Sequence, residues 1–175
     1  MPDIYKNDQM TVNYEVYEDR NSYLGITETT LPTIGFLTQE INGAGIAGAI
    51  EAVAPAYLNA MSITFKFRQT TSRTLGLAEP KRHHLTLRAA NQYEDPIAAK
   101  LGVEAVKHVL ECVPKTFNAG SLTPGNPNNG SVEMAVRYWA IYADGKKLVE
   151  LDPLNNKCYI NGTDYAEAVR KALGK

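Results

Sequence analysis

The sequence predicts a mainly antiparallel β protein with two or three helices, and three observations support this fold class. Apolar and polar residues alternate along several stretches, as they do in strands that face a core on one side and solvent on the other. An Asp-Gly pair at 144–145 and an Asn-Gly pair at 161–162 are typical of tight hairpin turns. The alternation is that of antiparallel strands, whereas strands of parallel sheets are apolar on both faces.

The composition is that of a single folded domain spanning residues 1–175, with 44% hydrophobic residues. Eighteen basic and 19 acidic residues give a net charge of −1, and no basic run is present, which disfavours tight binding of nucleic acid. No segment approaches the roughly 20 apolar residues of a membrane helix, and the first ten residues are polar, so we expect no membrane anchoring and no export signal. Cys112 and Cys158 are expected to be buried thiols in a reducing cytoplasm.

The first third of the chain predicts a hairpin followed by a long loop. Residues 1–11 are expected to form a mobile arm, and strands at 12–17 and 23–30 flank a turn, with a third strand at 34–41. Residues 43–60 are rich in Gly and Ala, contain Pro55 and show no clear period, so we expect an extended loop that needs cover from a neighbouring surface. Its candidate interface residues are Gly43, Gly45, Ile46, Gly48, Ile50, Val53, Tyr57 and Leu58.

The middle of the chain predicts further strands. Residues 61–67 and 84–89 alternate clearly, and a short helix is expected within 70–78. Residues 100–113 fit a helix slightly better than a strand by periodicity alone. Residues 122–131, rich in Gly, Pro and Asn, are expected to form a flexible loop.

The last quarter predicts a long strand, a hairpin and a short helix. Residues 132–142 alternate, but Trp139 and Ile141 make the opposite face apolar too, so both are candidates for contact with another subunit. The chain returns through 148–151, adds a short strand at 158–160 and ends in a helix. Asp164 and Glu167 are expected to cap that helix as a capping pair.

No catalytic motif is convincing. The string GAGIAG at 43–48 matches the dinucleotide-binding fingerprint, but Pro55 would interrupt the helix that the fingerprint requires, and no parallel strand follows. His83 and His84 are adjacent and would point to opposite faces of a strand, so they cannot chelate one ion together. We therefore expect no enzyme activity, no cofactor, no metal and no catalytic residue.

Several segments resemble the major tail tube protein family of contractile-tailed bacteriophages, which includes the tubes of phage-tail-like bacteriocins. The resemblance spans nearly the whole chain and is carried by YEVYED at 14–19, TLP at 30–32, GAGIAG at 43–48, YADGK at 142–146, ELD at 150–152, ING at 160–162 and the ending from Asp164 to Gly174. It implies a twisted antiparallel β-sandwich or half-barrel with a flanking α-helix and a short C-terminal helix. It also places a strand at 100–113, which we adopt against the helical period.

The resemblance further implies a structural role in a virion tail assembled in the host bacterial cytoplasm. Six copies would form a ring, and stacked rings would form the inner tube that scaffolds the sheath. The implied partners are other copies of the chain, the tail sheath protein, a baseplate initiator, a tail terminator, and a tape measure protein and DNA in the lumen without tight binding. A tube of a type VI-like or extracellular contractile injection system is the alternative, and a nucleotide-dependent oxidoreductase is a remote one.

Overall fold

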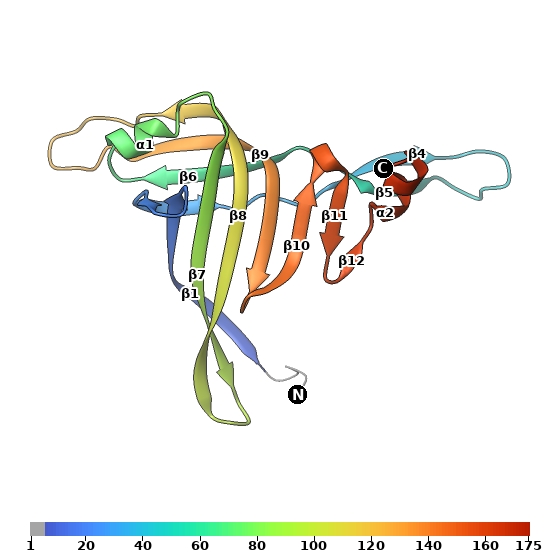
Figure 1. The fold of residues 1–175 in the computed structure, drawn as a ribbon, viewed down its shortest axis with the longest axis horizontal. Coiled ribbons are helices and arrows are strands. Elements are labelled where there is room, and N and C mark those ends of the chain that lie inside the picture. Colours follow the sequence, from blue (N-terminus) through green and yellow to red (C-terminus); the bar gives the residue numbers. More distant parts are fainter. Residues whose placement is uncertain (1–5) are drawn as a thin grey trace.

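A computed structural model describes residues 6–175 and consists mainly of one large antiparallel sheet (Figure 1). The main sheet has ten strands in the order β12-β11-β10-β9-β8-β7-β1-β2, with β6 branching from β9 and β3 from β6, and β4 and β5 form a separate two-stranded sheet. In chain order the elements are β1 (Asn7–Glu18), β2 (Ser22–Tyr23), β3 (Ile26–Thr30), β4 (Phe36–Ile41), β5 (Ile50–Leu58), β6 (Met61–Phe67), α1 (Ser72–Gly76), β7 (His83–Asp95), β8 (Lys100–Asn118), β9 (Gly130–Ala143), β10 (Lys146–Asp152), the 3-10 turn η1 (Pro153–Asn155), β11 (Lys157–Ile160), β12 (Thr163–Asp164) and α2 (Glu167–Ala172). The mainly β fold class is therefore confirmed, and both helices are short.

Tight turns with positive φ angles join the strands of the C-terminal half. Asp144 (φ 46°) and Gly145 (φ 81°) connect β9 with β10, and Asn161 (φ 47°) and Gly162 (φ 91°) connect β11 with β12. Both central residues of a type I′ turn need positive φ, which Asn, Asp and Gly adopt most readily. The two turns predicted from the sequence are confirmed.

The core lies where β6, which runs beside the first half of β9, crosses behind β7 and β8 (Figure 1). The first half of β9 pairs with β6 on one side and with the end of β8 on the other, whereas its second half pairs with β8 and β10. Because the sheet forks at β9, its two branches can enclose apolar side chains between them. Alternate residues of β6 are fully or almost fully buried, as the alternation predicted: Met61, Ile63, Phe65 and Phe67.

A β-bulge at Arg137 reverses the alternation of β9 halfway along the strand. Val136 and Tyr138 lie opposite Cys112 and Glu111, which are adjacent in β8, so Arg137 is an extra residue on the β9 side. One extra residue moves every later side chain to the other face of the sheet. Val136 and Trp139 therefore both face the core, although their positions differ by an odd number. The apparent second apolar face of this strand is largely a consequence of the bulge.

The N-terminal region differs from expectation in two ways. Residues 7–11, expected in a mobile arm, belong to β1 and pair with β7, and residues 1–5 of that arm lie outside the described part of the chain. The expected first hairpin is reduced to the two-residue β2, because β3 leaves β1 and pairs with β6 instead. In this position Ile26 and Thr29 of β3 are half-buried, and the other three residues of the strand are exposed.

Three other expectations concern secondary structure. Residues 100–113 form a strand within β8, so the slight helical period was misleading and the family-based expectation is confirmed. Helix α1 falls within 70–78 as predicted. The expected capping pair of Asp164 and Glu167 is wrong: α2 begins at Glu167 without a side-chain cap, and Asp164 instead accepts a hydrogen bond from the Ala166 amide (3.0 Å) and forms an ion pair with Arg170 (2.6 Å).

No helix in the described residues is long and apolar enough to cross a membrane.

A substitution at Gly130 tests how tightly the strands pack where the sheet forks. An added Cβ at Gly130 would lie 2.3 Å from Phe67 Cε2 and 2.8 Å from the Asn118 carbonyl oxygen, and Phe67 cannot move away because its ring stacks on Phe117. We expect Gly130→Ala to lower the free energy of unfolding by about 1–3 kcal/mol. Urea unfolding followed by the fluorescence of Trp139 measures it.

Gly76→Ala is the matched control for this prediction. No atom lies within 4 Å of a Cβ added at Gly76 at the end of α1, so this substitution should be neutral or stabilise the protein by up to about 1 kcal/mol. Equal stability of the two variants would contradict the tight packing between β6, β8 and β9.

Candidate assembly surfaces

The β4–β5 hairpin stands apart from the main sheet and is the most exposed element built from apolar residues (Figure 1). Its register runs from Phe36 opposite Leu58 to Ile41 opposite Ile50. The base is held by Asn59, whose amide donates to the Gly35 carbonyl (2.9 Å) and whose side chain donates to the Phe36 carbonyl (3.0 Å). Residues 50–58, expected within an extended loop, thus form a strand whose base packs on the core.

Beyond its base the hairpin exposes large apolar side chains to solvent. Tyr57 is the most exposed of them, at 61%. A two-stranded sheet alone is at best marginally stable in water, and contiguous exposed apolar side chains mark contact surfaces. The exposed apolar residues of the hairpin and its turn are Leu37, Ile41, Ile46, Ile50, Val53 and Tyr57.

The glycine-rich string at 43–48 forms most of the turn between β4 and β5. It joins two antiparallel strands and opens no helix, so it lacks the strand–helix geometry that holds a pyrophosphate. Gly45 has a φ of +89°, and a Cβ added at Gly43, Gly45 or Gly48 would meet no atom within 4 Å. The turn therefore presents bare backbone to its surroundings, and another surface can approach it closely.

Trp139 and Ile141 lie in the main sheet and not with the hairpin. Trp139 is 4% exposed, and its Nε1–H donates to Nδ1 of His108 at 3.3 Å. Ile141 is half-buried on the same face, opposite His108 in the register. Trp139 is therefore covered within its own chain, contrary to the expectation that it waits for another subunit. Sequence alone misassigned it because the bulge at Arg137 has no simple sequence signature.

Glu150 is the centre of a polar cluster on the opposite face of the sheet, which we call the polar face. Its carboxylate accepts hydrogen bonds from Tyr138 (3.1 Å) and Lys147 (2.8 Å) and forms an ion pair with Lys157 (3.0 Å). Burial opposes ionisation of this 8% exposed residue, but the hydrogen bonds from Lys147, Lys157 and Tyr138 outweigh burial and hold the pKa of Glu150 below its usual value.

Other cations of the polar face are also matched within the chain. Arg88 lies 5.4 Å from the ring centroid of Tyr17, and Lys107 lies 4.6 Å from that of Tyr142. Arg82 pairs with Glu111 at 3.1 Å. Arg82 is thus neutralised by a carboxylate, whereas Arg88 and Lys107, which lie opposite each other in the register, contact aromatic rings and keep their charge.

Sequence reasoning missed a second group of exposed apolar residues, at the far end of the β7–β8 hairpin and the adjacent part of β1. The outer edge of β1 has no strand partner there among the described residues, because β2 covers only Tyr17 and Glu18. The signal was present in the sequence but fell in the presumed arm and in the ambiguous stretch after residue 100. The residues are Met10, Val12, Ile97, Leu101 and Val103.

His83 and Cys112, which a catalytic or metal site could have used, are both buried. Residues 6–175 contain no cluster of three side chains able to hold a metal ion. His83 is buried, with its ring nitrogens 2.5 Å from Glu18 Oε1 and 3.0 Å from the Glu79 carbonyl oxygen. Burial raises the pKa of the Cys112 thiol to about 12, which makes it a poor nucleophile.

Comparisons with known proteins agree with this arrangement. The family model described as Phage tail tube protein FII matches residues 8–174. The tail tube protein of Escherichia phage P2 is 24% identical over 163 residues, which cover 91% of this chain and 93% of the relative.

Two cryo-EM structures of an extracellular contractile injection system, PVC, share the fold. A chain of the sheath–tube complex in the extended state superimposes with a TM-score of 0.54 at 9% identity, covering 77% of this chain and 92% of the other. A chain of the sheath/tube terminator in the extended state gives a TM-score of 0.52 at 8% identity, covering 77% and 96%.

The Trp139–His108 contact predicts a pH dependence of stability. Burial lowers the pKa of His108 below its ordinary value of 6.5. The unfolded chain therefore binds a proton at a higher pH than the folded chain, and the contribution of His108 to the free energy of unfolding decreases as pH falls below about 6.5. Urea titrations at about pH 7.5 and pH 5.5 should show a smaller pH-dependent loss for His108→Gln, which cannot titrate, than for the unsubstituted protein. Identical losses would contradict the buried neutral imidazole.

Proposed function

This chain belongs to the phage tail tube protein FII family, and we propose that six copies close into a ring and that rings stack into the inner tube of a contractile tail. The family resemblance inferred from the sequence is thereby confirmed. The protein is a non-enzymatic tail tube protein of a contractile phage tail or a phage-tail-like injection system. What we propose beyond family membership is the ring, its stacking into a tube and its partners.

The β4–β5 hairpin is the observation that carries the proposal. Its exposed apolar side chains have no cover within the described residues, and its turn presents backbone that a neighbour can approach. An assembled ring supplies that cover, and ring closure also removes sheet edges that would otherwise promote aggregation. We retain Gly43, Gly45, Ile46, Gly48, Ile50, Val53, Tyr57 and Leu58 as proposed interface residues, with Ile141 as a peripheral one; the burial of Trp139 removes it from the set.

The polar face supports a role as a conduit. A groove that binds nucleic acid tightly does so through unpaired Lys and Arg that neutralise phosphates. Lys147 and Lys157 instead pair with the carboxylate of Glu150, and the cations near Tyr17 and Tyr142 are held over aromatic rings of the same chain. A tube with such a lumen would let DNA or a protein effector pass, and would accommodate a tape measure protein, without retaining them.

The further partners are a sheath protein, a tail terminator and a baseplate initiator. The similar chains come from a sheath–tube complex and from a sheath/tube terminator, which supports the first two. In a phage, the protein would lie in the virion tail after assembly in the cytoplasm of a bacterial host.

A tube of an extracellular contractile injection system is the second candidate, favoured by those same structural similarities. The tube itself has the same design in both cases, so neighbouring genes distinguish them. Capsid and DNA-packaging genes beside this one would indicate a phage, and their absence beside sheath and baseplate genes would indicate an injection device.

Electron microscopy of the purified, concentrated protein tests the proposal, with Gly45→Glu as the informative variant. The unsubstituted protein should form rings or tubes, and Gly45→Glu should remain folded but fail to assemble, because a charged side chain blocks close approach to the turn. Gly125→Glu is a matched control, since Gly125 (φ +82°) and Gly45 (φ +89°) share positive φ and open surroundings.

Two outcomes would contradict parts of this proposal. A monomer under all conditions would contradict the tube-forming role. Tube formation by Gly45→Glu equal to that of Gly125→Glu would exclude the glycine-rich turn from the interface.

A further inference from the structure

The β4–β5 hairpin carries two carboxylates without an ion-pair partner among residues 6–175. Glu40 and Glu51 are directly opposite each other in the register, both are exposed, and neither forms an ion pair within the described residues. Opposite residues of an antiparallel pair have Cβ atoms about 5 Å apart, and like charges at that distance destabilise the pairing. The arrangement becomes favourable if cations of another surface lie against both carboxylates.

Thr38 and Val53 share a face of the hairpin with this carboxylate pair. They lie opposite each other and two residues along from Glu40 and Glu51, so all four side chains project to one side. This face therefore combines two negative charges with the exposed apolar side chain of Val53. Its complement must be a surface with two positive charges next to an apolar recess.

Such a surface lies beside α1. A cleft of about 450 Å³ is lined by Tyr23, Leu24 and Gly25 on one side and by residues of the segment 68–74 on the other. Arg68 and Arg73 are among its lining residues, and both side chains are exposed. Arg73 donates only to the Tyr23 carbonyl oxygen (3.4 Å), and neither guanidinium has a carboxylate partner in the described part of the chain.

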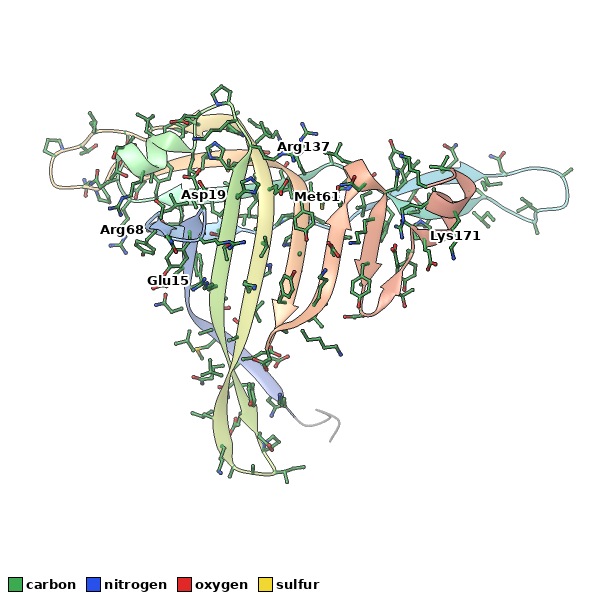
Figure 2. All side chains as sticks on the ribbon, in the orientation of Figure 1. Glu15, Asp19, Met61, Arg68, Arg137 and Lys171 are labelled. Atoms are coloured by element: carbon green, nitrogen blue, oxygen red, sulfur yellow. The ribbon has the colours of Figure 1, made fainter. Side chains whose placement is uncertain are left out.

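The hairpin and the cleft lie toward opposite ends of the molecule. The β4–β5 hairpin extends beyond α2 at one end of the longest axis, whereas α1 lies toward the other end (Figure 1). Figure 2 shows Arg68 near the α1 end and Lys171 of α2 near the hairpin end. A hairpin therefore cannot fill the cleft of its own chain. Complementary patches at opposite ends generate head-to-tail assemblies, which form rings where the rotation between copies closes.

We propose that the β4–β5 hairpin of one copy docks into the α1 cleft of the next copy, with Glu40 and Glu51 against Arg68 and Arg73 and Val53 in the apolar recess. This proposal rests on the proposed tube-forming function and assigns its head-to-tail contact to named groups. Arg forms bidentate, charge-assisted hydrogen bonds with carboxylates, so the two pairs would fix the register of the contact as well as its affinity.

Reciprocal charge reversal tests this contact. Glu40→Lys with Glu51→Lys places four cations at the contact, and Arg68→Glu with Arg73→Glu places four carboxylates there. We expect each double variant to raise the protein concentration needed for assembly at least about tenfold, because like charges across an interface are strongly unfavourable. The quadruple variant should assemble again, since it restores opposite charges and the original net charge.

A mixture of the two double variants is a second test of the contact. In a ring where the two variants alternate, every second contact pairs the introduced Lys residues of one hairpin with the introduced Glu residues of the next cleft. The contacts between them pair the native Glu residues with the native Arg residues. An equimolar mixture should therefore recover assembly in rings with an even number of copies. Arg137→Glu with Lys146→Glu is the control of equal charge change, because both cations lie outside the cleft and have no ion-pair partner within residues 6–175. It should assemble more readily than the variant with reversed cleft charges.

Sedimentation and electron microscopy measure assembly into rings or tubes, and circular dichroism shows whether each variant is folded. Normal assembly of either double variant, or failure of both the quadruple variant and the mixture to recover it, overturns the contact while leaving tube formation by the unsubstituted protein intact. Failure of the unsubstituted protein to assemble would instead contradict the proposed function.

Cysteine cross-linking keeps the proposal testable if charge reversal disturbs folding. Cys112 and Cys158 are buried, so cysteines introduced together by Glu51→Cys and Arg73→Cys should form disulfides between copies in assembled material. A chain carrying Glu51→Cys and Arg137→Cys should not cross-link. Equal cross-linking of the two pairs, or none for the first pair, overturns the contact.

Discussion

The β4–β5 hairpin cannot cover its own apolar side chains, and this constraint governs how the rest of the molecule is organised. The base of the hairpin is anchored by Phe36, Leu58 and the hydrogen bonds of Asn59, so its direction is fixed by the core. Its outer half has no second layer within the described residues. Such an exposed apolar surface is the basis for the proposed contact with a neighbouring copy, because it stays exposed until another molecule buries it.

In contrast to the hairpin, the main sheet covers most of its large apolar side chains within the chain itself. Because of the bulge at Arg137, the side chains of Val136 and Trp139 face the same core. The fork of the sheet at β9 places Phe65 and Phe67 in that core as well. On the polar face, the carboxylate of Glu150 draws two lysines and a tyrosine together, so these charged side chains are held by partners within the chain. The protomer thus combines a body with a well-packed core and a hairpin whose apolar side chains are exposed, and the proposed assembly into a tube accounts for the exposed hairpin.

Local chemistry in the sequence was sufficient to predict some elements and not others. The turns at Asp144-Gly145 and Asn161-Gly162 and the alternation of β6 were predictable, because each depends only on neighbouring residues. Strand β5 was hidden by its alanines and by Pro55, which is tolerated because it falls where the register with β4 shifts between Phe36 and Leu37. The burial of Trp139 depends on a bulge that only the pairing with β8 reveals. The proposed interface residues of the hairpin were chosen by composition, but the opposition of Glu40 and Glu51 required the register.

Hydrogen–deuterium exchange before and after assembly tests most directly the claim that the hairpin is covered by a neighbouring copy. Amides on the outer edges of β4 and β5, and those of the 42–49 turn, should exchange rapidly in the dissolved protomer and become protected in tubes, while amides of β6 and β9 in the core are protected in both states. Tubes in which the hairpin exchanges as fast as it does in the protomer would contradict the account.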